Sequence, residues 1–370
     1  MCLLKCSENF TGMNFTANQG CELFAVNSPS VKYLKTLAYG IIMLFSLLGN
    51  TAIIVIVLKN KRMRTTTNYL IVNMAASDLL ISSFAVPREL TEIYTGPRRW
   101  LVDGIAGLIL CKLVYVFQDI STAVSIQSLV VMAIDRYHGV VFPFRPPIAT
   151  AKVCKVVIPV IWTVALGVHG VYFYTVRLMV QDNKTYCSFS WVSKFEERQT
   201  QEHYFIFISV FLFLLPLCVI FSLYALIVLE LRKRQRAGSS ASALSNQRRR
   251  EDWAVMKKIL CIVFLFILCI TPITIAALLF YFVWDWHIPC GMDKLFQAAK
   301  FFFYSNASLN PCVYFALNDK YRKGLKDLLR RNRSLAENRN GLPMNMLQDR
   351  ENTVWSIRRD YSEMGSKLDI

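Results

Sequence analysis

The chain has 370 residues, of which 54% are hydrophobic and 18% are charged, and its 42 Lys and Arg outnumber its 25 Asp and Glu to give a net charge of +17. Soluble domains have about a quarter of their residues charged, so this composition argues against a water-soluble globule, a disordered chain and a small disulfide scaffold. The hydrophobic residues gather in blocks of about 20 or more, long enough for a helix to cross a hydrocarbon core about 30 Å thick.

These blocks follow one another along the chain near residues 37–58, 68–92, 110–140, 154–176, 204–230, 254–284 and 295–315. Each is continuously apolar instead of alternating in polarity. That pattern predicts helices that satisfy their own backbone hydrogen bonds, and it does not fit the strands of a membrane barrel. The predicted fold class is therefore an all-α membrane protein with a seven-transmembrane helix bundle over residues 37–315.

Basic residues predict how this bundle is oriented. Lys and Arg are concentrated in short segments beside the spans, at Lys59–Arg64, Arg136–Lys155, Arg232–Lys258 and from Lys320 onward. Such segments favour the cytoplasmic side, where anionic lipid attracts them. We therefore expect a multi-pass plasma-membrane protein with an extracellular N-terminus and a cytoplasmic C-terminus. Nucleic-acid binding is a weaker interpretation, because these cations lie directly beside apolar spans.

The segments outside the bundle carry further signals. Residues 1–36 form a predicted extracellular segment. Residues 316–331 place apolar and basic residues on opposite helix faces, which predicts a short amphipathic helix at the inner membrane interface. Residues 332–370 form a predicted disordered cytoplasmic tail, with Ser and Thr available to a receptor kinase. In the basic loop before the sixth span, phosphorylation of Ser239, Ser240, Ser242 and Ser245 could recruit arrestin, and the alternative is a flexible basic loop without this role. Glycosylation sequons at Asn9, Asn14 and Asn183 all fall on the predicted extracellular side.

Cysteines on that same side predict disulfides. Cys111 opens the third span, and Cys187 lies in the loop between spans four and five. A bond between them would tie this loop over the mouth of the bundle. Cys21 and Cys290 are a second candidate pair, and the pairing of Cys2 and Cys6 stays open.

Polar side chains inside the spans are candidates for function, because they are costly in lipid. Four predicted helices contribute such residues: Asn50, Asp78, Ser125, and both Asn306 and Asn310 in the last span. One carboxylate with hydroxyl and amide oxygens would suit a small hard cation such as Na⁺, or a proton. Alternatively, Asp78 is protonated and only hydrogen-bonded between helices. We expect no other cofactor.

Asp135, Arg136 and Tyr137 lie at the cytoplasmic end of the third span. Arg136 can pair with its neighbour Asp135 and can also reach Asp252 at the start of the sixth span. Release of a pair between Arg136 and Asp252 would let the sixth span move outward. Alternatively, Arg136 has no switching role and only extends its charged group from the helix to the membrane surface.

Prolines predict bends in the later spans, because each removes a backbone hydrogen bond. Pro216 lies in the fifth span and Pro272 in the sixth. The last span contains the sequence Asn310-Pro311-Cys312-Val313-Tyr314. Tyr224 and Tyr314 would then lie near the inner ends of their helices, where their hydroxyls could stabilise a rearranged state.

Taken together, these motifs resemble the rhodopsin-like (class A) G-protein-coupled receptors over about residues 33–331. The resemblance rests on residues that appear in the expected spans and order: Gly49, Asn50, Asp78, Cys111, Asp135, Arg136, Tyr137, Trp162, Cys187, Pro216, Tyr224, Pro272 and Asn310 to Tyr314. It implies ligand entry from outside, outward movement of the sixth helix and nucleotide exchange on a heterotrimeric G protein. We also expect that the chain is not an enzyme, because its short soluble segments contain no nucleophile and base pair, metal-ligand spacing or Gly-rich phosphate loop.

Within that family, the segments Leu58–Asn68 and Asp135–Pro146 are similar to segments of RFamide and neuropeptide FF receptors. This resemblance implies a basic or amidated neuropeptide as ligand. Carboxylates on the outer side would suit a peptide Arg. The candidate ligand contacts are Glu89, Glu92, Tyr115, Gln118, Asp119, Phe207, Tyr281 and Lys300, and further acids near the outer rim are Asp103, Glu196, Glu197 and Glu202.

Other ligands and activities stay open. Amine receptors usually carry Asp seven residues after the bridging cysteine, where this chain has Gln118, but Asp119 follows directly. A class A receptor for a biogenic amine or a lipid is therefore an alternative. An ion-coupled transporter or channel is a second alternative, although the paired repeats typical of transporters are not evident.

The sequence also departs from the family at the predicted switch. Family members commonly have Trp two residues before the proline of the sixth span, and here Ile270 precedes Pro272 at that spacing. Ile126, Pro216 and Phe266 still match the family's packing trio beneath the ligand cavity. We therefore expect the signal to be transmitted through these three residues.

Overall fold

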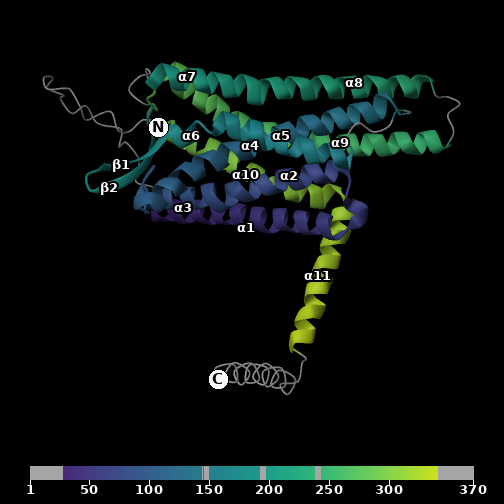
Figure 1. The fold of residues 1–370 in the computed structure, drawn as a ribbon, viewed down its shortest axis with the longest axis horizontal. Coiled ribbons are helices and arrows are strands. Elements are labelled where there is room, and N and C mark those ends of the chain that lie inside the picture. The colour runs from purple at the N-terminus through teal and green to yellow at the C-terminus, as the bar shows by residue number, and fades with distance from the viewer. Residues whose placement is uncertain are drawn as a thin grey trace, which may run out of the picture. The chain divides into compact units, whose positions relative to one another are not determined.

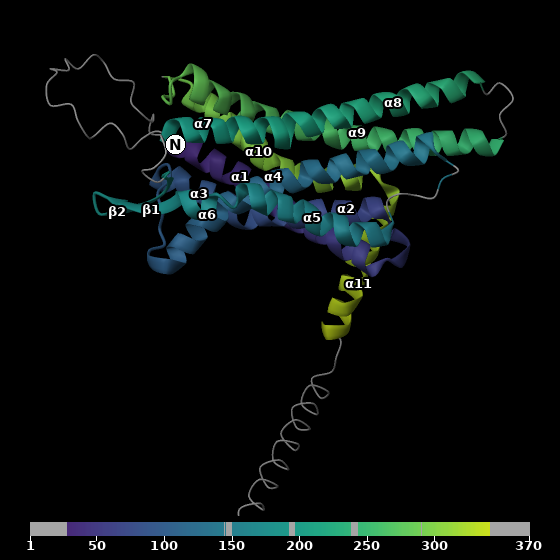
Figure 2. The ribbon, with the colours of Figure 1, turned by 45° about the horizontal axis from the view of Figure 1, so that its top comes forward.

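The structure is a computed structural model that describes residues 28–143, 145, 150–191, 197–237, 243–289 and 291–340. Helices dominate it and run side by side lengthwise in two views (Figures 1 and 2). Their bounds are α1 Pro29–Lys59, α2 Thr66–Leu80 with α3 Val86–Thr95, α4 Gly104–Val141, α5 Ala151–His169 with α6 Tyr172–Thr175, α7 Glu197–Ile208 with α8 Leu215–Ala237, α9 Ala243–Leu278, and α10 Asp293–Leu317.

Six helical segments in the described part of the chain are long and apolar enough to cross a membrane. The next long helix, α10, carries more polar residues, including Lys300, Asn306 and Asn310. The predicted helical membrane bundle is thus confirmed. Most helices extend beyond the predicted spans. For example, α1 begins at Pro29 instead of residue 37. Proline is tolerated in the first turn of a helix, because the backbone N–H that it lacks would have no partner within the helix at that position.

The central helix of the bundle is α4, which packs against α2, α5 and α8. Its buried residues are distributed along its whole length, from Gly107 to Val140. The helices α1 and α10 approach closely at Gly49, where an added Cβ would lie 2.6 Å from the Pro311 Cβ. Glycine is therefore required for this contact.

A β-hairpin lies between the fourth and fifth spans, and it is a local feature that the sequence did not predict. Its strands are β1 (Val176–Gln181) and β2 (Lys184–Phe189), and they pair antiparallel. The turn residues Asp182 and Asn183 have φ values of 49° and 57°, which suit a tight hairpin turn. We call the end of the bundle that carries this hairpin the hairpin end (Figure 1), and the opposite end the Arg136 end.

The predicted disulfide between Cys111 and Cys187 is confirmed, with a Cα–Cα distance of 5.8 Å. It connects β2 to the beginning of α4. The segment between α3 and α4 adds to the hairpin through a bridge between Arg99 and Tyr186. The position of the hairpin over α4 is thus fixed from two sides.

Short π-helical segments interrupt two spans and end a third, in their halves nearer the hairpin end. They are η2 (Ile81–Ala85), η3 (Ser209–Leu214) and η4 (Leu279–Val283). Pro216 follows η3 almost directly, and Pro272 and Pro311 lie inside α9 and α10. π-Helical turns and prolines both weaken the regular hydrogen-bond ladder of a helix.

The helix α11 (Asp319–Asn340) belongs almost entirely to a second unit, which comprises Lys320–Ile370. It begins and ends later than the amphipathic helix predicted at 316–331, so part of the predicted tail is helical. Several predicted features lie outside the described residues, namely Asn9, Asn14, Cys2, Cys6, Cys21 and Cys290. Cys154, Cys218, Cys261, Cys269 and Cys312 are free thiols.

Candidate functional site

A cluster of paired charges lies inside the hairpin end, and we call it the α3–α10 cluster. Arg88 Nη2 is 2.7 Å from Glu92 Oε1, and Lys300 Nζ is 2.7 Å from Glu89 Oε1. Lys300 Nζ also lies 3.7 Å from Glu92 Oε2. The exposed fractions of the Arg88, Glu89 and Glu92 side chains are 9%, 8% and 10%, whereas that of Lys300 is 30%. Charges so deeply buried need partners, and here two acids and two bases neutralise one another.

Uncharged residues extend this cluster toward α4. The Tyr304 hydroxyl lies 3.1 Å from Glu89 Oε1 and 2.8 Å from Gln118 Oε1. The Arg88 guanidinium lies 4.3 Å from the centre of the Tyr115 ring, and Tyr115 donates a hydrogen bond to the Cys187 carbonyl. Five of the predicted ligand contacts, Glu89, Glu92, Tyr115, Gln118 and Lys300, therefore lie in one connected network.

A second polar group, which we call the Asp119 cluster, lies on another side of α4. Tyr172 donates a hydrogen bond of 2.5 Å to Asp119 Oδ2, and His169 Nδ1 lies 3.9 Å from the same oxygen. The Tyr204 hydroxyl is 3.1 Å from His169 Nδ1. The Asp119 side chain is 26% exposed. Among the described residues no Lys or Arg pairs with Asp119, which distinguishes it from Glu89 and Glu92.

Aromatic rings surround the Asp119 cluster. The Tyr172 ring centre is 5.3 Å from that of Phe189 in the hairpin and 5.8 Å from that of Tyr204. The Tyr115 and Phe189 rings are 4.5 Å apart in an edge-to-face arrangement. Tyr172, which donates to Asp119, is thus held among aromatic rings from the hairpin and α7.

The other two predicted ligand contacts lie elsewhere. Phe207 is 45% exposed and its ring packs against Phe211, which is also exposed, so it joins neither cluster. Tyr281 is buried and its hydroxyl accepts a hydrogen bond of 3.2 Å from Gln201 Nε2.

The acids of the rim also have partners. Glu202 pairs with Arg198 and accepts a hydrogen bond from Trp286, and Asp103 accepts one from Thr185. Arg198 also bonds to Asp285, and this hydrogen bond lowers the pKa of the Asp285 carboxyl. Glu196 and the side chain of Glu197 lie outside the described residues. In the structure, most of the described rim acids thus already have a cationic or hydrogen-bonding partner, and their contact with a ligand stays a prediction.

Asp78 of α2 is fully buried, and polar side chains from other helices contact it. Asn310 Nδ2 donates to its Oδ2 at 2.9 Å, and Ser121 Oγ donates to its Oδ1 at 3.3 Å. Ser125 lies one helical turn from Ser121, and Asn306 lies one turn from Asn310. Three buried oxygens in this region, Asn50 Oδ1, Ser125 Oγ and Asn306 Oδ1, have no hydrogen-bond partner among the described residues. Such a donor set fits a small hard cation.

At the Arg136 end, Arg136 bonds to its neighbour Asp135 and lies 3.4 Å from Thr67 Oγ1 of α2. The Tyr137 ring packs edge-to-face on Phe142, with their centres 6.2 Å apart. Asp252 lies in α9, but its side chain falls outside the described part of the structure, so its predicted pair with Arg136 stays a prediction.

A cavity of about 220 Å³ opens beside Arg136. Its walls come from three helices, with Asp135 and Arg136 from α4, Ile227 from α8 and Met256 from α9. The buried Tyr224 hydroxyl has no hydrogen-bond partner among the described residues, and the Tyr314 hydroxyl lies 3.9 Å from Met74 Sδ.

The predicted transmission residues lie between these two ends. Ile126 and Phe266 are buried, and Phe266 packs near Phe213 with the ring centres 6.4 Å apart. Ile270 is also buried, where the family commonly has an indole. Pro216 is only partly buried.

Several residues of the two clusters were not predicted from the sequence. Arg88 lies four residues before Glu92, a spacing that favours an ion pair within a helix. This pair could therefore have been predicted from the sequence. His169, Tyr172 and Tyr204 come from two different spans, and no spacing in the chain connects them to Asp119. Only the packing of α4 against its neighbours brings them together.

Comparison with known proteins identifies relatives of this chain. A family model described as the 7 transmembrane receptor (rhodopsin family) matches residues 49–314. A QRFP-like peptide receptor of Branchiostoma floridae is 33% identical over 86% of this chain and 85% of its own length. Substance-P receptors are also similar, with 30% identity over 79% of this chain and 70% of the Mus musculus protein, and 28% over 88% of this chain and 77% of the Aquarana catesbeiana protein.

We expect Arg88→Met to destabilise the chain by about 3 kcal/mol, because it leaves a buried carboxylate without its partner. The double variant Arg88→Met/Glu92→Gln should recover part of this loss, since it removes both charges. Thermal unfolding of the purified chain in detergent would measure both effects.

The matched control is Arg198→Met, which breaks the exposed pairs with Glu202 and Asp285 and should change the unfolding temperature little. Equal effects of Arg88→Met and Arg198→Met would contradict a structural role for the buried pairs.

Proposed function

The chain belongs to the rhodopsin family of seven-transmembrane receptors, and from this premise we propose that it binds an extracellular peptide and activates a heterotrimeric G protein. Membership of this family implies a multi-pass protein of the plasma membrane. Relatives named as peptide receptors support a peptide ligand. A basic or amidated neuropeptide is the form of ligand that we propose.

The observation that carries this proposal is the contrast between the two polar clusters of the hairpin end. Glu89 and Glu92 already pair with Lys300 and Arg88, so they have little electrostatic attraction left for a basic ligand. Asp119 is partly exposed, and its closest described partner is a tyrosine hydroxyl. A ligand with a cationic group and several hydrogen-bonding groups would pair with Asp119 and reach Lys300 and Gln118, and a peptide has both features.

We further propose that the hairpin end faces outward and the Arg136 end faces the cytoplasm. Basic loops beside the Arg136 end support this orientation, as do the disulfide and the Asn183 sequon at the hairpin end. In this orientation Asn9 and Asn14 would also be available for glycosylation. The cytoplasmic tail would be the substrate of a receptor kinase, phosphorylated serines at 239–245 would recruit arrestin, and α11 would lie on anionic lipid.

For signalling, we propose that Arg136 leaves Asp135 and Thr67 in the active state and contacts the G protein. The cavity beside Arg136 already has walls from α4, α8 and α9, so outward movement of α9 would enlarge it. Tyr224 and Tyr314 would then stabilise the rearranged helices through their hydroxyls. Asp252 would hold α9 in the inactive state.

We also propose that Na⁺ binds at Asp78. The carboxylate, with oxygens of Ser125, Asn306 and Asn310, would hold the ion and supply one positive charge to a buried anion. Ser121, which already donates to Asp78, adds a hydroxyl oxygen to this set. Such an ion would stabilise the helix arrangement to which these oxygens belong.

A biogenic amine is the rival ligand, because Asp119 could also pair with a small ammonium group. We expect cells that express the chain to respond to amidated, Arg-containing peptides and not to biogenic amines, with a second-messenger signal as the measurement. Asp119→Asn should raise the peptide concentration for half-maximal response by about tenfold or more, as loss of a charge-assisted hydrogen bond predicts.

The control for this experiment is Asp103→Asn, which removes a carboxylate that is already hydrogen-bonded to Thr185. Its dose–response curve should stay close to that of the unmodified receptor. A response to amines that Asp119→Asn abolishes would rule out the peptide proposal.

Arg136→Ala should abolish agonist-driven nucleotide exchange, because it removes the guanidinium that we assign to G-protein contact. Surface labelling would establish that the variant reaches the plasma membrane in normal amounts. Full nucleotide exchange by a normally expressed Arg136→Ala receptor would refute this role.

The unfolding temperature of the purified receptor should be higher in NaCl than in KCl at equal ionic strength. An ion concentration ten times the dissociation constant adds about 1.4 kcal/mol of stability. Asp78→Asn should remove the difference between the salts, and Asp103→Asn should keep it. An identical response of Asp78→Asn and the unmodified receptor would exclude Na⁺ at Asp78.

A further inference from the structure

One face of the β-hairpin gathers arginine side chains. Cys187 of β2 bonds to Cys111 of α4, so Cys187 points toward the bundle. Tyr186 and Ser188 point to the opposite face, because side chains alternate along a strand. Arg177 of β1 lies opposite Ser188 in the strand register, so the Arg177 side chain shares this second face.

Two further arginines reach the same face from the segment between α3 and α4. Arg99 forms the bridge to Tyr186, and its guanidinium lies 5.6 Å from the centre of the Tyr186 ring. Arg98 has a φ of 58°, and its Nη1 donates a hydrogen bond of 3.1 Å to Ser188 Oγ. Arg98, Arg99 and Arg177 therefore surround Tyr186 and Ser188, and we call this surface the arginine face.

The arginine face has a surplus of positive charge. Neither Arg99 nor Arg177 forms an ion pair with a carboxylate in the described part of the chain. Asp103 accepts its hydrogen bond on the other face of the hairpin, and the acids of the α3–α10 cluster are paired with the bases of that cluster. At the tip of the hairpin, Asp182 and Lys184 carry opposite charges that offset each other. The surplus charge is therefore that of the arginines.

The arginine face is accessible to a large partner. Figures 1 and 2 both show the hairpin projecting past the ends of the neighbouring helices. Arg177 is exposed, and Arg98 and Arg99 are partly exposed. Because adjacent strands lie about 4.8 Å apart, these arginines are spread over about 10 Å across the sheet. This spread favours a polymer with repeated negative charges over one small anion.

We propose that the arginine face binds a sulfated glycosaminoglycan chain at the cell surface. A sulfate group presents several oxygens to the fork of a guanidinium, as phosphate does, and a guanidinium is weakly hydrated, so its desolvation costs little. Polysaccharides of this class are extracellular, so the choice of partner rests on the outward orientation proposed above for the hairpin end. A bound polyanion would also offset the repulsion between the arginine face and a basic peptide.

Heparin is a suitable probe, since it is a soluble sulfated polysaccharide. We expect fluorescent heparin to bind saturably to intact cells that express the full-length chain and lack glycosaminoglycan synthesis. Arg99→Gln and Arg177→Gln should each weaken this binding about threefold, and the double variant about tenfold, as expected for exposed ion pairs whose effects add. Surface labelling would establish that each variant reaches the membrane in equal amounts. Hyaluronan, whose charges are carboxylates, should compete weakly.

The matched control is Lys294→Gln, which removes an exposed positive charge at the beginning of α10, outside the arginine face, and should leave the heparin affinity unchanged. Arg177→Lys keeps the charge and should retain most of the affinity. Each neutralised arginine should also lower the slope of log Kd against log salt concentration by about one, as for other polyanions. A change that only disturbed the structure of the hairpin would not lower this slope stepwise.

Absence of saturable binding to the cells would overturn the proposal. Equal affinity of heparin for the unmodified chain and the Arg99→Gln/Arg177→Gln variant would also overturn it, and hyaluronan that competes as well as heparin would exclude recognition of sulfate. The purified chain in phosphatidylcholine nanodiscs exposes both ends of the bundle. An effect of the two arginines in nanodiscs without binding to cells would refute the outward orientation, and with it the extracellular partner. None of these measurements uses a peptide ligand, so they stay decisive if the peptide proposal fails.

Discussion

Polar groups that lie in hydrocarbon must find partners within the protein, and this constraint organises the bundle. Helices satisfy the backbone, but side chains must pair across helices. Trp162 of α5 donates to Asn73 of α2, which in turn donates to Ser128 of α4. Asn310 of α10 and Ser121 of α4 both donate to Asp78 of α2. The helices are thus connected at defined points, and the apolar contacts between them fill the remaining space.

The same constraint connects the two regions to which we assign ligand binding and ion binding. Lys300 and Tyr304 of the α3–α10 cluster lie in α10, and Asn306 and Asn310 of the Asp78 region follow within the next three turns of that helix. A ligand that changed the pairing of Lys300 would therefore act on a helix whose next polar residues contact Asp78. The shared helix gives a physical route by which ligand binding could change ion binding. Such an effect also requires that α10 have two discrete arrangements, which the ligand and the ion stabilise to different degrees.

The sequence was sufficient to predict the fold class, the Cys111–Cys187 bond and the family, because each of these depends on local features of the chain and not on tertiary contacts. Span length is set by bilayer thickness, and cysteine position by the ends of the spans. The hairpin was missed although Asp182 and Asn183 are typical turn residues. The pairing of Glu89 and Glu92 could not be predicted in full, because Lys300 is more than 200 residues away in the chain and only the packing of α10 brings it close.

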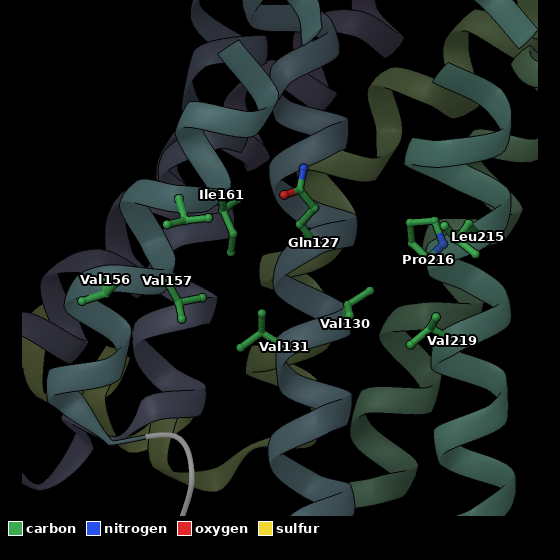
Figure 3. Close-up of a pocket in the computed structure, with 10 residues that line it drawn as sticks. Gln127, Val130, Val131, Val156, Val157, Ile161, Leu215, Pro216 and Val219 are labelled. Atoms are coloured by element: carbon green, nitrogen blue, oxygen red, sulfur yellow. The ribbon is translucent and has the colours of Figure 1, made fainter. Parts of the chain in front are cut away.

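The buried side-chain polar atoms that stay unpaired in the described part of the chain fall into three places, and their surroundings differ. Asn50, Ser125 and Asn306 contribute oxygens near Asp78, where water or an ion from the aqueous phase can satisfy them. Tyr224 lies in the half of α8 nearer the Arg136 end, where a rearranged helix or a partner protein could supply its partner. Gln127 lies beside aliphatic residues of α4, α5 and α8 (Figure 3), so few polar groups surround its amide. Its buried amide therefore keeps the free-energy cost of an unpaired polar group.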